Sequence, residues 1–168
     1  MKIAFGYKIS SGKDTCVDYL IQKYGGKKYS FSKYLYDILY YAQNICNFNK
    51  EKDRKFLQWI GTEWGRNIDK DVWIKLFLKD VKKDENNGVT NFFCSDVRFL
   101  NEFESLKKDG WICVKLNRYI ENDERIGSGN EKHISEYELD SLADDKWDFV
   151  INNNQTLNDL IKIMDKLF

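Results

Sequence analysis

The sequence predicts an α/β fold in which a mainly parallel sheet of about five strands is covered by helices on both faces. Short apolar runs alternate along the chain with segments whose apolar residues recur at helical spacing, which is the pattern of such a sheet. The length of 168 residues and the 42% share of hydrophobic side chains suit one domain with a substantial core. Strands are expected over residues 3–5, 28–31, 89–94, 111–116 and 147–151.

The first half of the chain is predicted to hold two of these strands and most of the helices. The helix after the first strand should stop at Gly25 and Gly26, because glycine readily leaves the helical conformation. Ser32 stands where an N-cap is expected, directly before the next apolar periodicity. Helices are expected over residues 13–24, 33–44, 54–64 and 71–83.

The second half continues the alternation of strand and helix. Gly110 should close one helix, and Thr156 should cap the last one. Residues 119–132 are polar and contain Gly127 and Gly129, which is typical of a mobile loop. Helices are expected over residues 100–109, 136–142 and 156–167.

The stretch GYKISSGKDT, residues 6–15, lies between the first strand and the first helix. This layout surrounds a phosphate with backbone N–H groups and a helix N-terminus, and Lys13 supplies a mobile positive charge. The spacing departs from the usual P-loop: Tyr7 holds the first glycine position, Asp14 stands where Ser or Thr is expected, and Thr15 follows. The alternative is a polar turn with an incidental lysine. The context favours a nucleoside triphosphate site.

Polar side chains follow the other predicted strands. They are Asp96, Arg98, Arg118, Asn152 and Asn153. In parallel sheets, ligands bind beyond the carboxyl ends of the strands. We therefore expect these side chains to converge with the phosphate loop on one cleft.

Two of these residues have a functional and a structural interpretation. Asp96 could hold Mg²⁺ through water, or it could cap the following helix. Arg98 could bind a phosphate with both guanidinium edges, or pair with Glu102 one helical turn later. Arg118 and Arg125 flank or lie within the polar loop, which could close over the phosphates as a lid or stay solvated.

Composition excludes several classes of function. The 27 basic and 27 acidic side chains cancel, so no bulk attraction to a nucleic-acid polymer is expected. The four cysteines are widely spaced, which indicates buried thiols in a reducing compartment. No signal peptide or run of membrane-spanning length is recognised, so we expect a cytoplasmic protein without a membrane partner. His133, the single histidine, is expected to be a structural or surface residue and not a catalyst. A homodimer is left open.

Several segments, taken in their order along the chain, resemble those of a known family. FGYKISSGKDT, LQWIGTEWGR, SDVRFLNEFESLKKDG and HISEYELD resemble the deoxynucleoside monophosphate kinases of phages and large DNA viruses, within the P-loop nucleoside monophosphate kinases. The resemblance implies one P-loop kinase domain over residues 1–168, with an acceptor-binding helical region at about 32–83 and a lid at about 119–135. It implies transfer of phosphate from ATP to a dNMP, giving ADP and dNDP, with Mg²⁺ as cofactor, in the host cytoplasm if the protein is viral.

The same resemblance implies roles for individual residues. On the alignment with the Gly-Lys-Gly-Thr of adenylate kinases, Thr15 takes the hydroxyl role near Mg²⁺, together with Asp96. The positive charges expected to act in catalysis are Lys13, Arg66, Arg98 and Arg118. The ATP side comprises Ser11, Gly12, Lys13, Asp14, Thr15, Arg118 and Arg125. The acceptor side comprises Lys33, Arg66, Trp73, Asp96, Arg98 and Glu102.

Two other functions stay open at this point. The chain could be another small-molecule kinase, because phosphomevalonate kinases of animals also carry an S-G-K-D segment. It could also be a P-loop-like protein that binds a nucleotide without transferring phosphate. The cluster of arginines favours a transferase, since a pure binder does not need so many cations near the γ-phosphate.

Overall fold

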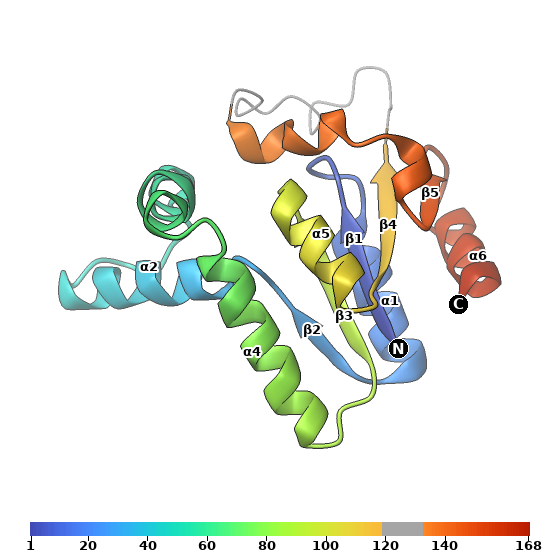
Figure 1. Ribbon diagram of the computed structural model, residues 1–168, viewed down its shortest axis with the longest axis horizontal. Helices are drawn as coiled ribbons and strands as arrows, with labels where there is room; N and C mark the ends of the chain where they lie inside the picture. Colours follow the sequence, from blue (N-terminus) through green and yellow to red (C-terminus); the bar gives the residue numbers. More distant parts are fainter. Residues whose placement is uncertain (119–132) are drawn as a thin grey trace.

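The computed structural model describes residues 1–118 and 133–168, and within them five parallel strands form one sheet in the order β2-β3-β1-β4-β5 (Figure 1). Every neighbouring pair in this sheet is parallel, which confirms the predicted α/β fold. The strands are β1 Lys2–Gly6, β2 Lys27–Tyr29, β3 Phe92–Val97, β4 Ile112–Asn117 and β5 Phe149–Asn152.

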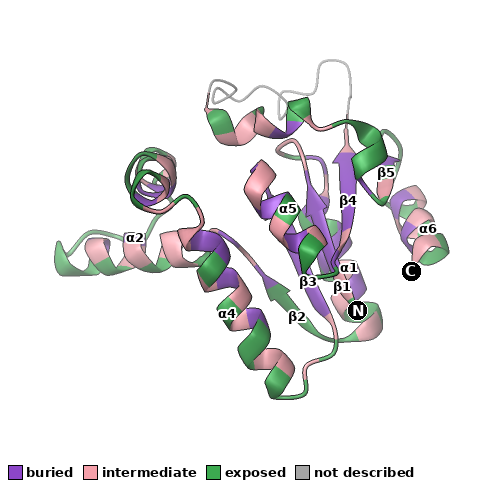
Figure 2. Cartoon of the chain, viewed as in Figure 1, coloured by how far each residue is buried: buried purple, intermediate pink, exposed green. Residues whose placement is uncertain are grey.

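The sheet separates two hydrophobic cores, one on each face. Val17 and Leu20 of α1 and Met164 of α6 pack with Phe5 and Val114 on one face. A second core, built on the opposite face, holds side chains of α4 and α5. Figure 2 shows buried residues concentrated in the central strands. The helices are α1 Lys13–Tyr24, α2 Lys33–Ile45, α3 Arg54–Gln58, α4 Val72–Asn86, α5 Leu100–Lys108 and α6 Leu157–Leu167.

Strand β3 corrects a predicted boundary. It runs over Phe92–Val97, and not over residues 89–94. Val97 is buried and pairs with Gly6, so the strand continues through the polar Ser95 and Asp96. Those two polar residues were mistaken for the end of the strand because burial of Val97 is a tertiary effect that a local pattern does not show.

The predicted helix over residues 54–64 is also different. The α-helix ends at Gln58, and a π-helix, Trp59–Arg66, follows it. The side chain of Trp73 packs into this segment: its Nε1 donates to the carbonyl of Gly61 at 2.8 Å, and a Cβ on Gly65 would lie 2.5 Å from its Cζ2. Gly65 therefore makes room for the indole inside the helical region, and the carbonyl of Gly61 accepts its N–H. In Figure 1, α2 and this region extend away from the sheet.

Smaller corrections concern turns and single residues. The helix expected over 136–142 consists of short 3₁₀ turns, Ile134–Glu136 and Glu138–Ser141. Cys46 is exposed, whereas the other cysteines are buried as expected. Thr156 caps α6 through a capping box with Asp159, as predicted. The proposed lid lies largely outside the described residues, and Arg125 lies wholly outside them. In the described ranges, none of the helices has the length and apolar character needed to span a bilayer.

Candidate active site

The loop between β1 and α1 holds three residues in the left-handed backbone region, and a tyrosine stands at the first glycine position of the usual P-loop. Tyr7 and Gly12 have φ angles of 92° and 100°, and Ser10 has 58°, all in the left-handed region that favours glycine. Two ammonium groups lie near the Tyr7 ring, Lys115 Nζ at 4.1 Å and Lys8 Nζ at 5.0 Å from its centroid. These cation–π contacts stabilise the unusual conformation of the tyrosine.

Lys13 is buried at the start of α1, with 6% of its surface exposed. Its Nζ donates to the carbonyl oxygen of Lys8 and to Ser11 Oγ, at 3.1 Å from the latter. Burial lowers the pKa of Lys13 to about 7, and the positive charge of Arg98 acts in the same direction. A phosphate beside this amine would therefore gain a counter-ion and restore its charge.

The next two residues, Asp14 and Thr15, lie in the first turn of α1. Asp14 Oδ1 accepts from Ser95 Oγ at 2.6 Å and pairs with Lys28 Nζ at 2.8 Å. Burial alone would raise the pKa of Asp14, but these bonds from Lys28 and Ser95 hold it below its ordinary value. Asp14 thus ties α1 to the neighbouring strands. Thr15 is exposed in the first turn of the helix, where its hydroxyl can approach a bound ligand.

A cavity of about 820 Å³, counted out to its open mouth, lies beside the end of β3. Five of the six residues predicted for the acceptor side line it: Arg66, Trp73, Asp96, Arg98 and Glu102. The sixth, Lys33, does not; its Nζ pairs with Asp80 of α4 at 2.7 Å.

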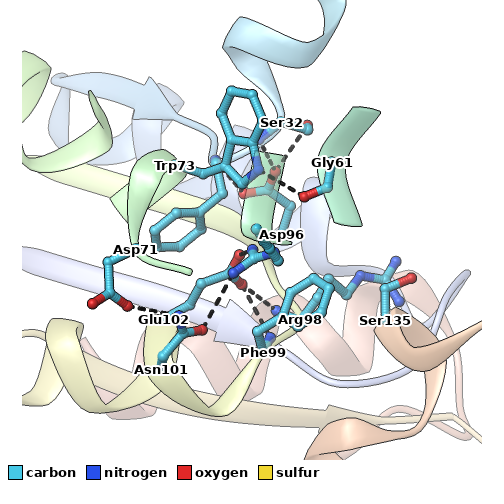
Figure 3. A network of polar contacts seen from close by, with 12 residues as sticks. Ser32, Gly61, Asp71, Trp73, Asp96, Arg98, Phe99, Asn101, Glu102 and Ser135 are labelled. Atoms are coloured by element: carbon cyan, nitrogen blue, oxygen red, sulfur yellow. Dashed lines mark hydrogen bonds and ion pairs between the residues drawn. The ribbon is translucent and has the colours of Figure 1, made fainter. Parts of the chain in front are cut away.

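Glu102 organises one wall of this cavity (Figure 3). Its Oε1 accepts from Arg66 Nη2 at 2.5 Å, and its Oε2 accepts from the backbone amides of Arg98 at 2.8 Å and Phe99 at 3.1 Å. Burial raises the pKa of Glu102 to about 7, against the opposing effects of Arg66 and the two amides. The guanidinium of Arg66 also lies over the Phe99 ring, 3.7 Å from its centroid. Glu102 therefore caps α5 and holds Arg66 at the cavity.

Asp96 connects β3 to the loop before α2. Its Oδ2 accepts from Ser30 Oγ at 2.5 Å, Ser32 Oγ at 2.9 Å and Ser32 N at 3.1 Å, and its Oδ1 accepts from Phe31 N at 3.1 Å. Ser32 stands at the N-cap position of α2, as predicted. Its hydroxyl donates to Asp96, however, and makes no capping bond to the helix. A carboxylate with these partners fits a water-mediated contact with Mg²⁺ better than direct ligation. Within the part of the chain that the structure describes, no three acidic, His or Cys side chains are grouped to hold a metal.

Arg98 has a partner that the sequence did not indicate. Its Nη1 pairs with Glu136 Oε2 at 2.8 Å, while only its backbone amide contacts Glu102. The carbonyl of Glu136 accepts from Lys8 Nζ at 2.8 Å. The segment around Glu136 thus joins the cavity to the phosphate loop. Arg98 and Glu136 are 38 residues apart, so no local signal links them.

Further residues of the cavity were missed or given another role. His133 was expected to be a structural or surface residue; it lines the cavity, and its Nδ1 lies 2.8 Å from Ser135 Oγ. Arg118 follows β4 and is partly buried. Cavity residues absent from the predicted site are Phe31, Ser32, Leu35, Tyr36, Lys52, Arg54, Leu57, Gln58, Gly61, Thr62, Phe99, Ser135 and Glu136.

Comparison with known families decides the relationship of this chain. Residues 44–164 match the sequence model of the deoxynucleotide monophosphate kinase family. The chain belongs to this family. The resemblance predicted from the sequence is therefore confirmed, and membership of a kinase family confirms the expected enzyme class, a phosphotransferase.

Two viral proteins are similar in sequence. The uncharacterized protein ORF77 of Ictalurid herpesvirus 1 is 34% identical over 147 residues, which cover 84% of this chain and 60% of that protein. A candidate deoxynucleotide monophosphate kinase of Acanthamoeba polyphaga mimivirus is 27% identical over 176 aligned residues, covering 89% of this chain and 86% of the relative. The chain thus spans about 60% of the length of the herpesvirus protein.

Two solved structures share the fold. A sugar kinase from Janibacter sp. HTCC2649 aligns with a TM-score of 0.57 at 14% identity, covering 96% of this chain and 90% of the other. Dephospho-CoA kinase from Campylobacter jejuni aligns with a TM-score of 0.53 at 20% identity, covering 99% and 96%. At such identities the likeness concerns the architecture, and it confirms the P-loop-type kinase fold.

Proposed function

We propose that this protein transfers the γ-phosphoryl group of ATP to a deoxynucleoside monophosphate, giving ADP and the diphosphate. One observation supports the proposal in addition to membership of the family. The phosphate loop with Lys13 and the cavity with Arg98 are joined through Glu136, whose carbonyl contacts Lys8 and whose carboxylate contacts Arg98. Two sites suited to anions therefore lie next to each other, as transfer between two phosphate groups requires.

On the ATP side, the backbone of the phosphate loop and the N-terminus of α1 would receive the phosphates, with Lys13 as counter-ion. Thr15 would hold Mg²⁺ through its hydroxyl, with Asp96 in water-mediated contact; the metal neutralises phosphate charge when bound. Arg118 would approach the phosphates from the end of β4. We keep Arg125, which the structure does not describe, as part of a lid in the same proposal.

On the acceptor side, Arg98 would bind the phosphate of the monophosphate once released from Glu136. Arg66, held by Glu102, would add a second positive charge, and Trp73 would form part of the apolar lining. Lys33 has no part in the proposed site, because it lies outside the cavity.

The transfer needs charge neutralisation more than a general base. An oxygen of the acceptor phosphate is already ionised at neutral pH and attacks the γ-phosphorus of ATP. The bond from that phosphorus to the oxygen bridging to the β-phosphate breaks, and the electron pair leaves on ADP. Lys13 and Arg98 would offset the charge on the leaving and attacking oxygens.

A coupled assay of ADP release tests the proposal across dTMP, dGMP, dCMP, dAMP, hydroxymethylated dCMP and phosphomevalonate. Turnover with one or more deoxynucleotides supports it, and Lys13→Ala should lower kcat by a factor on the order of 10²–10³. Turnover with phosphomevalonate alone would instead identify a different small-molecule kinase. ATP binding without turnover on any acceptor would leave a nucleotide-binding protein.

A further inference from the structure

Two adjacent asparagines at the end of β5, Asn152 and Asn153, lie in different surroundings. Asn153 is 8% exposed, and its Nδ2 donates to the carbonyl of Ser11 in the phosphate loop at 2.9 Å. Its backbone amide donates to the carbonyl of Asn117 at 2.7 Å, which anchors it to the end of β4. Asn152 is exposed, and its Oδ1 accepts from Asn117 Nδ2 at 3.1 Å. Of this pair, it is therefore Asn153 whose side chain bonds to the phosphate loop.

The bond to Ser11 controls the direction of a neighbouring amide. A trans peptide is planar, so its C=O and N–H groups point in opposite directions. When Asn153 fixes the carbonyl of Ser11, it also fixes the N–H of Gly12, which lies in the same plane and points the opposite way. Gly12 has a φ of 100° and immediately precedes α1, where amides of a phosphate-binding turn act.

Close packing reinforces this control. A Cβ built on Gly12 would lie 2.8 Å from Asn153 Nδ2, so the amide group of Asn153 rests directly against the glycine. Ser11 is 1% exposed, which leaves its carbonyl little access to water as an alternative partner. Without the amide of Asn153, the Ser11–Gly12 peptide would lose a donor that holds its orientation.

We propose that Asn153 is a positioning residue of the phosphate loop, which aims the Gly12 N–H at the phosphates of ATP. The proposal rests on the proposed ATP-binding function of the loop. It adds a contribution from the last strand, distant in sequence from the loop. Asn153 makes no contact with substrate in this account, because it acts through the Ser11–Gly12 peptide.

Two substitutions separate the donor from the shape of the side chain. Asn153→Leu keeps the branching of the side chain without a polar group, and Asn153→Asp keeps the shape and volume but offers no donor to a carbonyl. Asn152→Ala is the matched control. Asn152 is adjacent in sequence, and the hydrogen bond described for its side chain is to Asn117 and not to the phosphate loop. Circular dichroism establishes folding of each variant.

Calorimetry then measures the Kd for MgATP and for inorganic tripolyphosphate, and steady-state assays measure the KM for each substrate. Loss of one oriented donor should weaken both phosphate ligands by a similar factor, on the order of tenfold, while the KM for the monophosphate stays unchanged. The control should match the wild type. A general structural defect would instead change the KM of both substrates.

The outcomes distinguish the two proposals. A wild-type chain that binds neither MgATP nor tripolyphosphate would overturn the proposed function. Wild-type binding with unchanged affinity in folded Asn153→Leu or Asn153→Asp would overturn only the role of Asn153. If the leucine variant does not fold, the aspartate variant decides, since it preserves the volume and the backbone bond to Asn117.

Discussion

Binding of MgATP should be accompanied by uptake of a proton at Lys13. Burial lowers the pKa of this amine to about 7 in the ligand-free chain, from an ordinary 10.5. The difference disfavours the charged form by on the order of 5 kcal/mol. Phosphate oxygens beside Nζ would reverse that effect, because an opposite charge favours the protonated amine.

The size of the effect follows from the two pKa values. At pH 8 a group with a pKa of about 7 is about 10% protonated, so binding should take up about 0.9 proton when the bound pKa lies well above 8. Above pH 7 the Kd should therefore rise about tenfold per pH unit. At pH 6 the amine is already charged, and uptake should fall to about 0.1 proton.

Calorimetry in buffers of different ionisation enthalpy measures this uptake directly. Lys13→Arg is the control, because a guanidinium stays protonated throughout this range and should take up none. MgATP is the suitable ligand, since it is fully ionised at pH 8. Uptake near zero at pH 8 in the wild type, or equal uptake in the arginine variant, would refute the assignment of Lys13 to the phosphates.

The same shift has a consequence for folding. The folded-state pKa of Lys13 lies below that of the unfolded chain, so the unfolded chain binds more protons between about pH 7 and 10.5. The contribution of this group to the free energy of unfolding is therefore least favourable below pH 7 and improves as pH rises through that window.

Three further substitutions test other contacts of the site. Glu136→Gln removes the anion paired with Arg98 and should lower the KM for the monophosphate severalfold in steady-state assays; a higher KM would mean that Glu136 binds the acceptor. Gly65→Ala places a Cβ 2.5 Å from Trp73 Cζ2 and should reduce the free energy of unfolding by about 1–3 kcal/mol in urea titrations, and an unchanged midpoint would contradict this packing. Glu102→Gln removes the carboxylate paired with the buried guanidinium of Arg66, so at pH 8, where a carboxyl with a pKa of about 7 is mostly ionised, we expect loss of about 3 kcal/mol of stability and a higher KM for the monophosphate; wild-type values for both would show that the pair is dispensable.

The fold could be predicted from the sequence where local chemistry and tertiary structure agree. The first helix matches its predicted bounds, since it starts after the left-handed Gly12 and stops at Gly25, both local signals. The π-helix and the end of β3 could not be predicted in this way. They depend on the packing of Trp73 into the helical region and on the burial of Val97, which are long-range contacts.

Some parts of the candidate site could also be predicted from the sequence, and others could not. The candidate phosphate loop could be predicted because its residues are contiguous and its chemistry is carried by the backbone. The acceptor cavity was only partly anticipated: Arg98 was recognised at the end of its strand, but its partner Glu136 comes from a distant segment. Lys33, also predicted for the acceptor side, does not line the cavity, and its side chain pairs with Asp80 on another helix, a contact that the local sequence does not indicate.

A crystal structure with a bisubstrate inhibitor, in which adenosine and a deoxynucleoside are joined by a chain of phosphates, tests the central claim most directly. We expect the phosphates to run from the loop after β1 to Arg98, with Lys13 Nζ turned from the Lys8 carbonyl toward them and Arg98 released from Glu136. An inhibitor bound elsewhere, or bound with both of these contacts intact, would contradict the account.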